Sequence, residues 1–210
     1  MKIGKGDRLA LFCANGCTRE QLDETAERAL GSAWKPVPAP EGETETRARA
    51  GKQAAALRLW SGSTPCQGTP AAAYLARRGL ATLATSPALR CRPDCWHPEG
   101  GRYPALVALV EDAAGKPLAV HRTYLRPDGS KADADPVKAS LGPVWGGAIR
   151  LDRLAPELVI GEGIETSASA GRLLGLPAWA ALSAGNLALG LALPAEVRAV
   201  VIAADADGPG

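Results

Sequence analysis

The sequence predicts an α/β and α+β protein, in which a mixed antiparallel N-terminal core subdomain precedes a Rossmann-like parallel sheet. Two observations predict this order. Between about residues 87 and 150, apolar and β-branched runs are separated by short turns, which is typical of antiparallel hairpins. From residue 157, short apolar runs alternate with helical segments, which is typical of a parallel, doubly wound sheet. Apolar residues make up 46% of the 210 residues, so the chain can bury a core around both parts.

Residues 1–31 are predicted to form a small N-terminal segment. The turn CANGC precedes TREQLDETAERAL, which reads as a helix. Thr18 and Gln21 have the spacing of a capping box, in which each side chain accepts a hydrogen bond from the other residue's backbone amide. Cys13 and Cys17 are candidate zinc ligands, because thiolates on a turn before a helix are typical of structural zinc sites. No Cys or His precedes Cys13, so the segment has the form of a zinc ribbon without its first half.

Residues 32–52 are predicted to be a linker, because they are rich in proline and charge and almost lack bulky apolar side chains. Residues 53–150 form the next predicted unit. It opens with helices at 53–60 and 70–78, and continues with strands 105–112 and 117–125, which form a hairpin around the turn AAGK.

Residues 151–210 are predicted to contain the parallel sheet. Its buried strands are 157–161, the run AWAALSAGN, and 199–204, and IETSASAGRLLG after the first strand reads as a helix. Ser183 and Asn186 lie at the tip of the second strand, where they either contact substrate or cap the helix that follows.

Three carboxylates follow two of these strands. Glu162 comes directly after strand 157–161, and Asp205 and Asp207 follow strand 199–204. Functional groups of an open parallel sheet gather at this edge, and alternation along the strand puts Asp205 and Asp207 on one side. Clustered carboxylates remain ionised when a cation lies between them, and hard oxygen ligands suit Mg²⁺ or Mn²⁺. We therefore predict a catalytic metal site at Glu162, Asp205 and Asp207; the alternative is that they are solvated turn residues or helix caps.

The charges are distributed unevenly. Residues 58–150 contain 12 Lys and Arg against 7 Asp and Glu, whereas residues 151–210 contain 3 against 7. This pattern suits a polyanion-binding surface beside a cation site, or it is ordinary surface variation. Arg122, Arg126, Lys131 and Lys138 fall within 17 residues. They are predicted to bind nucleic-acid or nucleotide phosphates without reading sequence, and the alternative is a solvated basic face.

Three stretches, VIGEGIETSAS, ALSAGNL and VVIAADADG, resemble the Toprim domain that bacterial DnaG-type primases, topoisomerases and some nucleases share. Glu162-Gly163 matches the Glu-Gly of that domain, and Asp205-Ala-Asp207 matches its Asp-x-Asp. Glu165 stands where primases often carry an aspartate. The motifs GEGIET and LSAGN resemble those in the primases of phages, plasmids and other mobile elements. Toprim domains normally continue past the Asp-x-Asp-Gly, so we expect a partial Toprim domain and a chain truncated at both ends.

The upstream region resembles the primase branch of this family. GTPAAAYLARRGL resembles the helix that opens the primase catalytic core, and residues 103–151 resemble the N-terminal subdomain of that core, in which Lys138 would lie beside phosphates. The resemblance implies a primase, a nucleotidyltransferase of DNA replication that makes short RNA primers from ribonucleoside triphosphates on a single-stranded DNA template. It implies that Asp205 and Asp207 bind Mg²⁺ or Mn²⁺, that Glu162 is a ligand or a general acid/base, and that a replicative helicase is a potential partner.

Two other functions remain open. One is a Toprim-type metal-dependent nuclease, which shares the carboxylates but needs no triphosphate site. The other is an inactive fragment that binds single-stranded DNA or a helicase.

The remaining cysteines and the overall composition bear on zinc and on location. Cys91 and Cys95, with His97, repeat the spacing of the first pair and are a second candidate zinc set, although the long linker favours independent units. Cys66 is predicted to be buried. The chain has no run of 18 apolar residues, no apolar signal-peptide core and no disulfide framework, so we expect a cytoplasmic protein that does not interact with a membrane.

Overall fold

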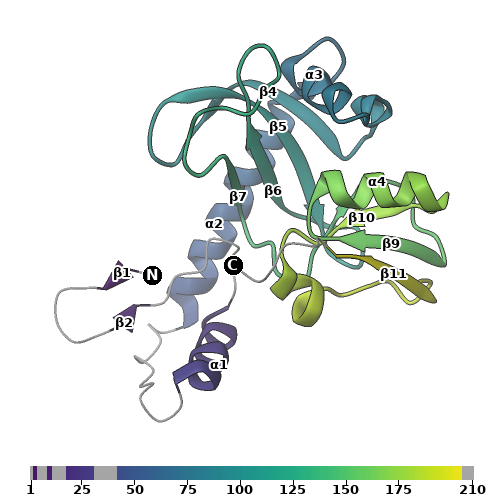
Figure 1. Cartoon of the computed structure of the whole chain (residues 1–210). Helices are drawn as coiled ribbons and strands as arrows, with labels where there is room; N and C mark the ends of the chain where they lie inside the picture. The colour runs from purple at the N-terminus through teal and green to yellow at the C-terminus, as the bar shows by residue number, and fades with distance from the viewer. Residues whose placement is uncertain (1, 4–8, 11–17, 31–41, 205–210) are drawn as a thin grey trace.

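The structure is a computed structural model that describes residues 2–3, 9–10, 18–30 and 42–204 (Figure 1). Two sheets organise residues 42–204. The first sheet has five antiparallel strands in the order β3-β4-β5-β6-β7, and the second has four strands in the order β11-β9-β10-β8. Within the second sheet β11, β9 and β10 are parallel, and β8 runs antiparallel to β10. The predicted fold class, an antiparallel part followed by a part with parallel strands, is confirmed.

The predicted hairpin is present as β5 and β6, which pair in antiparallel register from Ala105 opposite Tyr124 to Val110 opposite Ala119. The short strand β8 follows the first sheet in sequence but pairs with the second. The described elements are β1 (Lys2–Ile3), β2 (Leu9–Ala10), α1 (Arg19–Leu30), α2 (Gly42–Ser61), β3 (Thr64–Pro65), α3 (Pro70–Arg77), η2 (Ala81–Thr85), β4 (Leu89–Trp96), β5 (Arg102–Glu111), β6 (Pro117–Tyr124), β7 (Lys138–Leu141), β8 (Ile149–Arg150), β9 (Glu157–Gly161), α4 (Ile164–Leu174), β10 (Ala178–Ala180), η3 (Asn186–Gly190) and β11 (Ala199–Ala203).

Three apolar clusters form the core, and the largest joins the two sheets. It contains residues of α3 and of one face of the first sheet, together with Ile164 and Ala168 of α4 and Ala180 of β10. A second cluster lies on the other face of the first sheet, where Ala56 of α2 is fully buried. The third lies in the second sheet around Trp179. Because α4 shares a core with α3, the first turn of α4 is held against the first sheet.

Local signals in the sequence place several helix ends correctly. The backbone amide of Thr18 donates to Oε1 of Gln21 (2.7 Å) and the amide of Gln21 donates to Oγ1 of Thr18 (3.4 Å), so the predicted capping box is confirmed. Gly79 follows α3 with φ +71° and Gly175 follows α4 with φ +67°. Glycine adopts this left-handed conformation without steric cost, which is why both helices end there.

Two local expectations are wrong. Helix α2 begins at Gly42, not at residue 53, so residues 42–52 of the expected linker are helical. Residues 46–52 are all exposed. This part of α2 therefore lacks the apolar stripe by which an amphipathic helix is recognised, although alanine, arginine, glutamate and lysine all favour helix. The expected buried strand 199–204 is instead a half-exposed edge strand, β11, in which Val201 is 43% exposed and Ile202 is 54% exposed.

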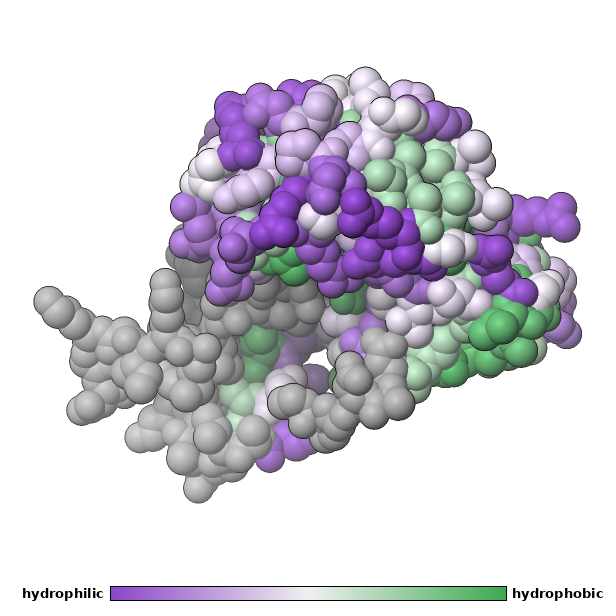
Figure 2. All heavy atoms as spheres, turned by 45° about the horizontal axis from the view of Figure 1, so that its top comes forward, coloured by the Kyte–Doolittle hydropathy of each residue, from purple (hydrophilic) through white to green (hydrophobic). Residues whose placement is uncertain are grey.

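Figure 2 shows hydrophobic side chains gathered at the right-hand end of the molecule, where elements of the second sheet lie. Among the described residues, none of the helices is both long and apolar enough to cross a bilayer.

Candidate active site

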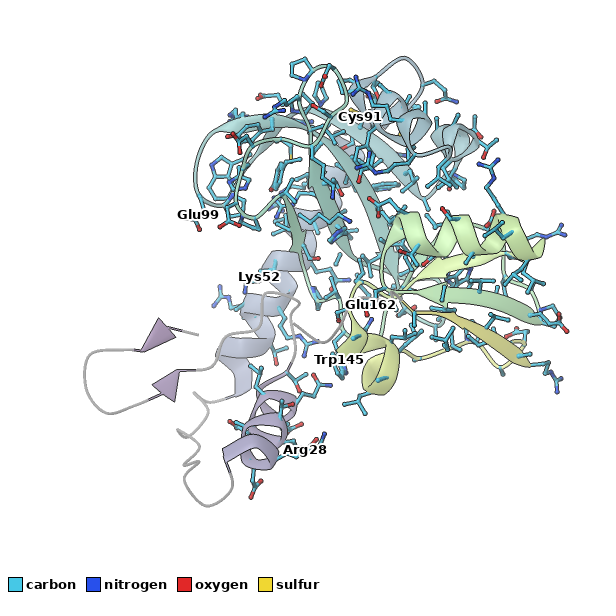
Figure 3. The ribbon with its side chains drawn as sticks, viewed as in Figure 1. Arg28, Lys52, Cys91, Glu99, Trp145 and Glu162 are labelled. Carbon is cyan, nitrogen blue, oxygen red and sulfur yellow. The ribbon has the colours of Figure 1, made fainter. Side chains whose placement is uncertain are left out.

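Glu162 lies at the carboxyl end of β9, the central parallel strand of the second sheet. The residue before it, Gly161, leaves space for its neighbours, since a Cβ there would lie 2.9 Å from the carbonyl oxygen of Ala203 and 3.0 Å from Oγ of Ser167. The Glu162 side chain is half-buried, and within the described ranges it has no hydrogen-bond or ion-pair partner. Figure 3 shows Glu162 at the end of the second sheet that faces the first sheet. Within the described part of the chain, its carboxylate is therefore not committed to another side chain.

The backbone of Glu162 is tied to the loop that follows β10. Its carbonyl accepts a hydrogen bond from the amide of Leu182 (2.8 Å), a residue that has φ +75°. A non-glycine residue in this region is strained by about 1–2 kcal/mol, and such residues concentrate at functional sites. The loop therefore has one defined position beside the strand end.

Asn186 holds this loop against the glycine-rich segment 145–147. Its side chain is 1% exposed; Nδ2 donates to the carbonyls of Gly147 (2.9 Å) and Ala181 (2.8 Å), and Oδ1 accepts from the amide of Gly146 (2.9 Å). Ser183 Oγ in turn accepts from the amide of Asn186 (3.2 Å). Both residues thus lie in the segment that follows β10, next to Leu182, whose amide contacts Glu162. Their contacts favour the capping and positioning alternative over substrate contact, because both donors of Asn186 are used within the chain.

A polar cluster surrounds Glu165, which lies in the first turn of α4, three residues after Glu162. Nζ of Lys138 is 3.3 Å from Oε1 and 3.2 Å from Oε2 of Glu165. The Tyr74 hydroxyl donates a hydrogen bond to Oε1 of the same carboxylate, and Nε of Arg78 is 4.0 Å from it. The guanidinium of Arg78 stacks on the Tyr74 ring, 3.7 Å from its centroid. We call Tyr74, Arg78, Lys138 and Glu165 the Glu165 cluster.

The charges of the Glu165 cluster are strongly coupled. Burial alone would raise the pKa of Glu165, but the Lys138 ammonium and the Tyr74 hydroxyl outweigh it and lower that pKa to about 2. Next to the cluster, His121 Nδ1 lies 3.0 Å from Ser140 Oγ across the β6–β7 pair. Burial, together with the positive charge of Lys138, lowers the pKa of His121 to about 4, so its imidazole is neutral near pH 7.

The four predicted phosphate-binding residues fall into different environments. Arg122 is a correction: it is 4% exposed, and its guanidinium donates to the carbonyls of Trp96, Ala139 and Ser140, each at 3.3 Å. Arg122 faces the α2 side of the first sheet. Residues of a strand alternate between the two faces of the sheet, and Val120 and Tyr124, two residues before and after Arg122, pack on the α2 side. Lys131 is exposed, and Arg126 is exposed with Asp133 at 4.0 Å. Figure 2 shows a hydrophilic band across the middle of this face of the molecule. Of the four, Lys138 is the one that belongs to the Glu165 cluster.

The second candidate zinc set is not assembled. Cys91 packs in the core cluster that includes α3, whereas Cys95 packs on the opposite face of the sheet with α2, because the register of β4 shifts between Arg92 and Cys95. Both ring nitrogens of His97 are used: Nε2 donates to the carbonyl of Pro136 (3.0 Å) and Nδ1 accepts from the amide of Glu99 (3.2 Å). Cys66 is fully buried, as predicted, and burial raises the pKa of its thiol to about 12.

Asp205 and Asp207 of the predicted catalytic metal site lie outside the described residues, and so do Cys13 and Cys17, the first candidate zinc pair. Within the described ranges, no three His, Cys, Asp or Glu side chains gather as a metal site. Glu162 does fit a magnesium-type ligand, because its carboxylate is unpaired in that part of the chain, and Mg²⁺ is commonly held by one or two carboxylates with waters.

Comparison with protein families agrees with this geometry. The family model described as a Toprim domain matches residues 157–210. The chain contains a Toprim domain. A second family model, described as a domain of unknown function (DUF7146), matches residues 50–151.

Comparisons over the whole chain find less. Among solved structures, the RNA polymerase domain of Mycobacterium tuberculosis primase DnaG is similar, with 18% identity and a TM-score of 0.41. That similarity covers 72% of this chain and 59% of that one, so the Toprim-containing chain spans less than two thirds of the primase domain's length. No curated protein matches the sequence.

Sequence reasoning missed Tyr74 and Arg78 as neighbours of the Toprim segment, and it treated Glu165 only as a departure from the primase pattern. One signal was present. Tyr74 lies in α3 and Arg78 is the C-cap residue of that helix, four residues later, so the spacing favours one side of the helix for both. The hydrogen bond between Tyr74 and Glu165 joins positions 91 residues apart in the chain, which no local pattern predicts.

Proposed function

We propose that this chain is the catalytic-core segment of a DnaG-like DNA primase that makes short RNA primers on single-stranded DNA from ribonucleoside triphosphates. The observation that carries the proposal is the pairing of two chemistries at one edge of the Toprim sheet. Glu162, whose carboxylate has no partner among the described residues, directly follows β9, and three residues later in the chain Glu165 gathers two cations, Lys138 and Arg78. A polymerase active site needs both, because a metal-binding carboxylate must lie beside cations that hold phosphates.

Glu162 would bind Mg²⁺ or Mn²⁺ together with Asp205 and Asp207. When bound, such ions supply the positive charge that stabilises a phosphoryl-transfer transition state and activates the attacking hydroxyl. The chain's own contribution is positional: the Leu182 amide holds the Glu162 backbone (2.8 Å), and Asn186 holds the loop that carries Leu182. Lys131 and Arg126, which are exposed, would hold the template by its phosphates.

The test is primer synthesis by the purified chain. Labelled ribonucleoside triphosphates are incubated with single-stranded DNA and Mg²⁺ or Mn²⁺, and products are resolved on a denaturing gel. We expect short products from the parent and a loss of about a hundredfold or more in Glu162→Gln, since a single electrostatic group in an active site contributes roughly this much. The matched control is Glu157→Gln, which removes an exposed carboxylate from the other end of β9.

The rival activities give different results in the same reactions. A Toprim nuclease would nick labelled single-stranded DNA in a metal-dependent way without incorporating nucleotides. A chain that binds single-stranded DNA but neither nicks it nor synthesises primers with either metal would refute the catalytic proposal. A replicative helicase as partner is part of the proposal, and pull-down with the helicase of the same replication system tests it.

A further inference from the structure

Glu165 lies three residues after the candidate metal ligand Glu162, but its contacts give it another role. Its two oxygens are held by the Lys138 ammonium, the Tyr74 hydroxyl and, at longer range, the Arg78 guanidinium. Lys138 belongs to β7 of the first sheet, and Tyr74 and Arg78 come from α3 and its C-cap. Glu165 belongs to α4. With its oxygens already used by hydrogen-bond donors, Glu165 is a poor ligand for a cation.

The Lys138 ammonium retains capacity for a ligand. An ammonium has three N–H donors, and Lys138 directs Nζ at the two oxygens of one carboxylate, 3.3 and 3.2 Å away. Its side chain is 34% exposed, so the remaining donor is accessible. Lys138 can therefore bind Glu165 and an external anion at the same time.

Arg78 is oriented in the same way. Its guanidinium is stacked on the Tyr74 ring, 3.7 Å from the centroid, Nη1 donates to the Tyr74 carbonyl (3.4 Å), and Nε faces Glu165. The side chain is 30% exposed, and within the described part of the chain Nη2 makes no hydrogen bond. The Glu165 carboxylate thus orients two cations, Lys138 and Arg78. The three charged groups together carry a net charge of +1, and both cations keep N–H donors for a ligand.

We propose that Glu165 is a positioning residue, which holds Lys138 and Arg78 beside the Glu162 strand end so that their free N–H groups bind phosphate oxygens of the substrate. The inference rests on the proposed function for the identity of the substrate. Glu165 acts through the two cations and does not contact the reacting atoms.

If Glu165 positions the two cations, its removal has the opposite effect on phosphate binding from the one expected if only its charge matters. If only net charge mattered, Glu165→Gln would strengthen the binding of a polyanion, because a negative charge near the phosphates is removed. If Glu165 positions the cations, the same change weakens binding, because Lys138 and Arg78 lose the geometry in which they meet a phosphate. The sign of the effect therefore decides between the two.

The experiment measures binding of two probes to the full chain. One is MgATP, followed by isothermal titration calorimetry, and the other is fluorescein-labelled oligothymidylate, followed by anisotropy. We expect Glu165→Gln to bind at least one probe about tenfold more weakly, which is the value of one charge-assisted hydrogen bond. Whichever probe is affected identifies the phosphates as those of the nucleotide or of the template strand. In a Lys138→Met background, Glu165→Gln should weaken binding much less.

Three controls keep the test interpretable. Asp128→Asn removes a carboxylate that pairs with Arg77 of the same α3 helix (3.4 Å) but is exposed, so binding should stay equal or become tighter. Tyr74→Phe keeps the buried ring and removes only the hydroxyl that donates to Glu165, so it should weaken binding in the same direction by a smaller factor. Labelling of Lys138 by an amine-reactive reagent, quantified by mass spectrometry, should be faster in Glu165→Gln because the ammonium is released.

The outcomes separate this inference from the proposed function. Unchanged or tighter binding of both probes by Glu165→Gln overturns the inference, and so does unchanged labelling of Lys138. A parent chain that binds neither probe overturns it as well. Probe binding that weakens as expected in a chain that makes no primers supports the inference and contradicts only the catalytic proposal.

Discussion

Replacing Asn186 with alanine should destabilise the protein strongly, although the residue lies at the start of the short helical segment η3. The change removes three side-chain hydrogen bonds of 2.8–2.9 Å, to Gly146, Gly147 and Ala181. Asn186 is 1% exposed, so water cannot replace its side chain without entering the core. At about 1 kcal/mol for each hydrogen bond, and somewhat more where a buried partner is left unsatisfied, the free energy of unfolding should fall by about 3 to 4 kcal/mol. This is a large fraction of the stability of a typical domain.

Urea denaturation followed by far-ultraviolet circular dichroism measures this loss, with the parent and variant compared by linear extrapolation. The matched control is Ser183→Ala, which removes one longer hydrogen bond, 3.2 Å, from a partly exposed hydroxyl. It should cost less than about 1 kcal/mol. Equal and small losses in both variants would refute the claim that Asn186 clamps the loop to segment 145–147.

A third variant, Asn186→Asp, tests which atoms matter. It keeps an acceptor for the Gly146 amide but places an ionised carboxylate against the carbonyls of Gly147 and Ala181. We expect it to be at least as unstable as the alanine variant at pH 8 and to recover part of the loss at pH 5, because a protonated carboxyl can donate one hydrogen bond. A pH-independent loss would indicate that the donors of Asn186 do not contribute.

The remaining predictions concern charge. The pKa of Glu165 is lowered from 4.5 to about 2, so its contribution, on the order of 3 kcal/mol, is present above the unfolded-state pKa and is lost as pH falls toward 2. Glu165→Gln should flatten this part of the stability–pH profile measured by urea denaturation. His121, with its pKa lowered to about 4, should not titrate between pH 5 and 8 by nuclear magnetic resonance, and a midpoint near 6.5 would contradict its placement beside Lys138 within the sheet. Arg122→Met should reduce the free energy of unfolding by about 2 kcal/mol or more and leave the salt dependence of single-stranded DNA binding unchanged. Lys131→Ala should leave the free energy of unfolding unchanged and reduce the salt dependence of binding. A reduced salt dependence in Arg122→Met would restore that residue as a phosphate contact.

Local patterns were reliable wherever one short stretch contains all the determinants of a feature. The capping box at Thr18 and Gln21 depends on residues within a single turn, and the structure shows it. The strand before Glu162 was predicted with the same bounds, 157–161, because its apolar run is short and is followed at once by a glycine and a charged residue. The helical start of α2 was missed because its exposed, charged turns have no apolar periodicity.

Patterns of charge along the chain were a poorer guide, because they do not say which face of a strand a residue occupies. Arg122 and Lys138 were grouped as one basic cluster. In the sheet, Arg122 faces α2 and is covered, whereas Lys138 faces α4 and meets Glu165. A difference of one residue in strand register reverses the face, and register depends on the partner strand. The same reason separates Cys91 from Cys95, since the irregularity in β4 places them on opposite faces of the sheet.

By itself, the sequence determined the order of the two sheets, the Toprim motif and the position of Glu162 at a strand end, because each depends on residues that are neighbours in the chain. The tertiary structure decided what surrounds that strand end. It brought Tyr74 and Arg78 of α3 to Glu165 of α4, and it turned Asn186 inward as a clamp. Those contacts result from the packing of α3 and α4 into one apolar core, and packing between distant segments depends on complementary shape and burial, which no local spacing encodes.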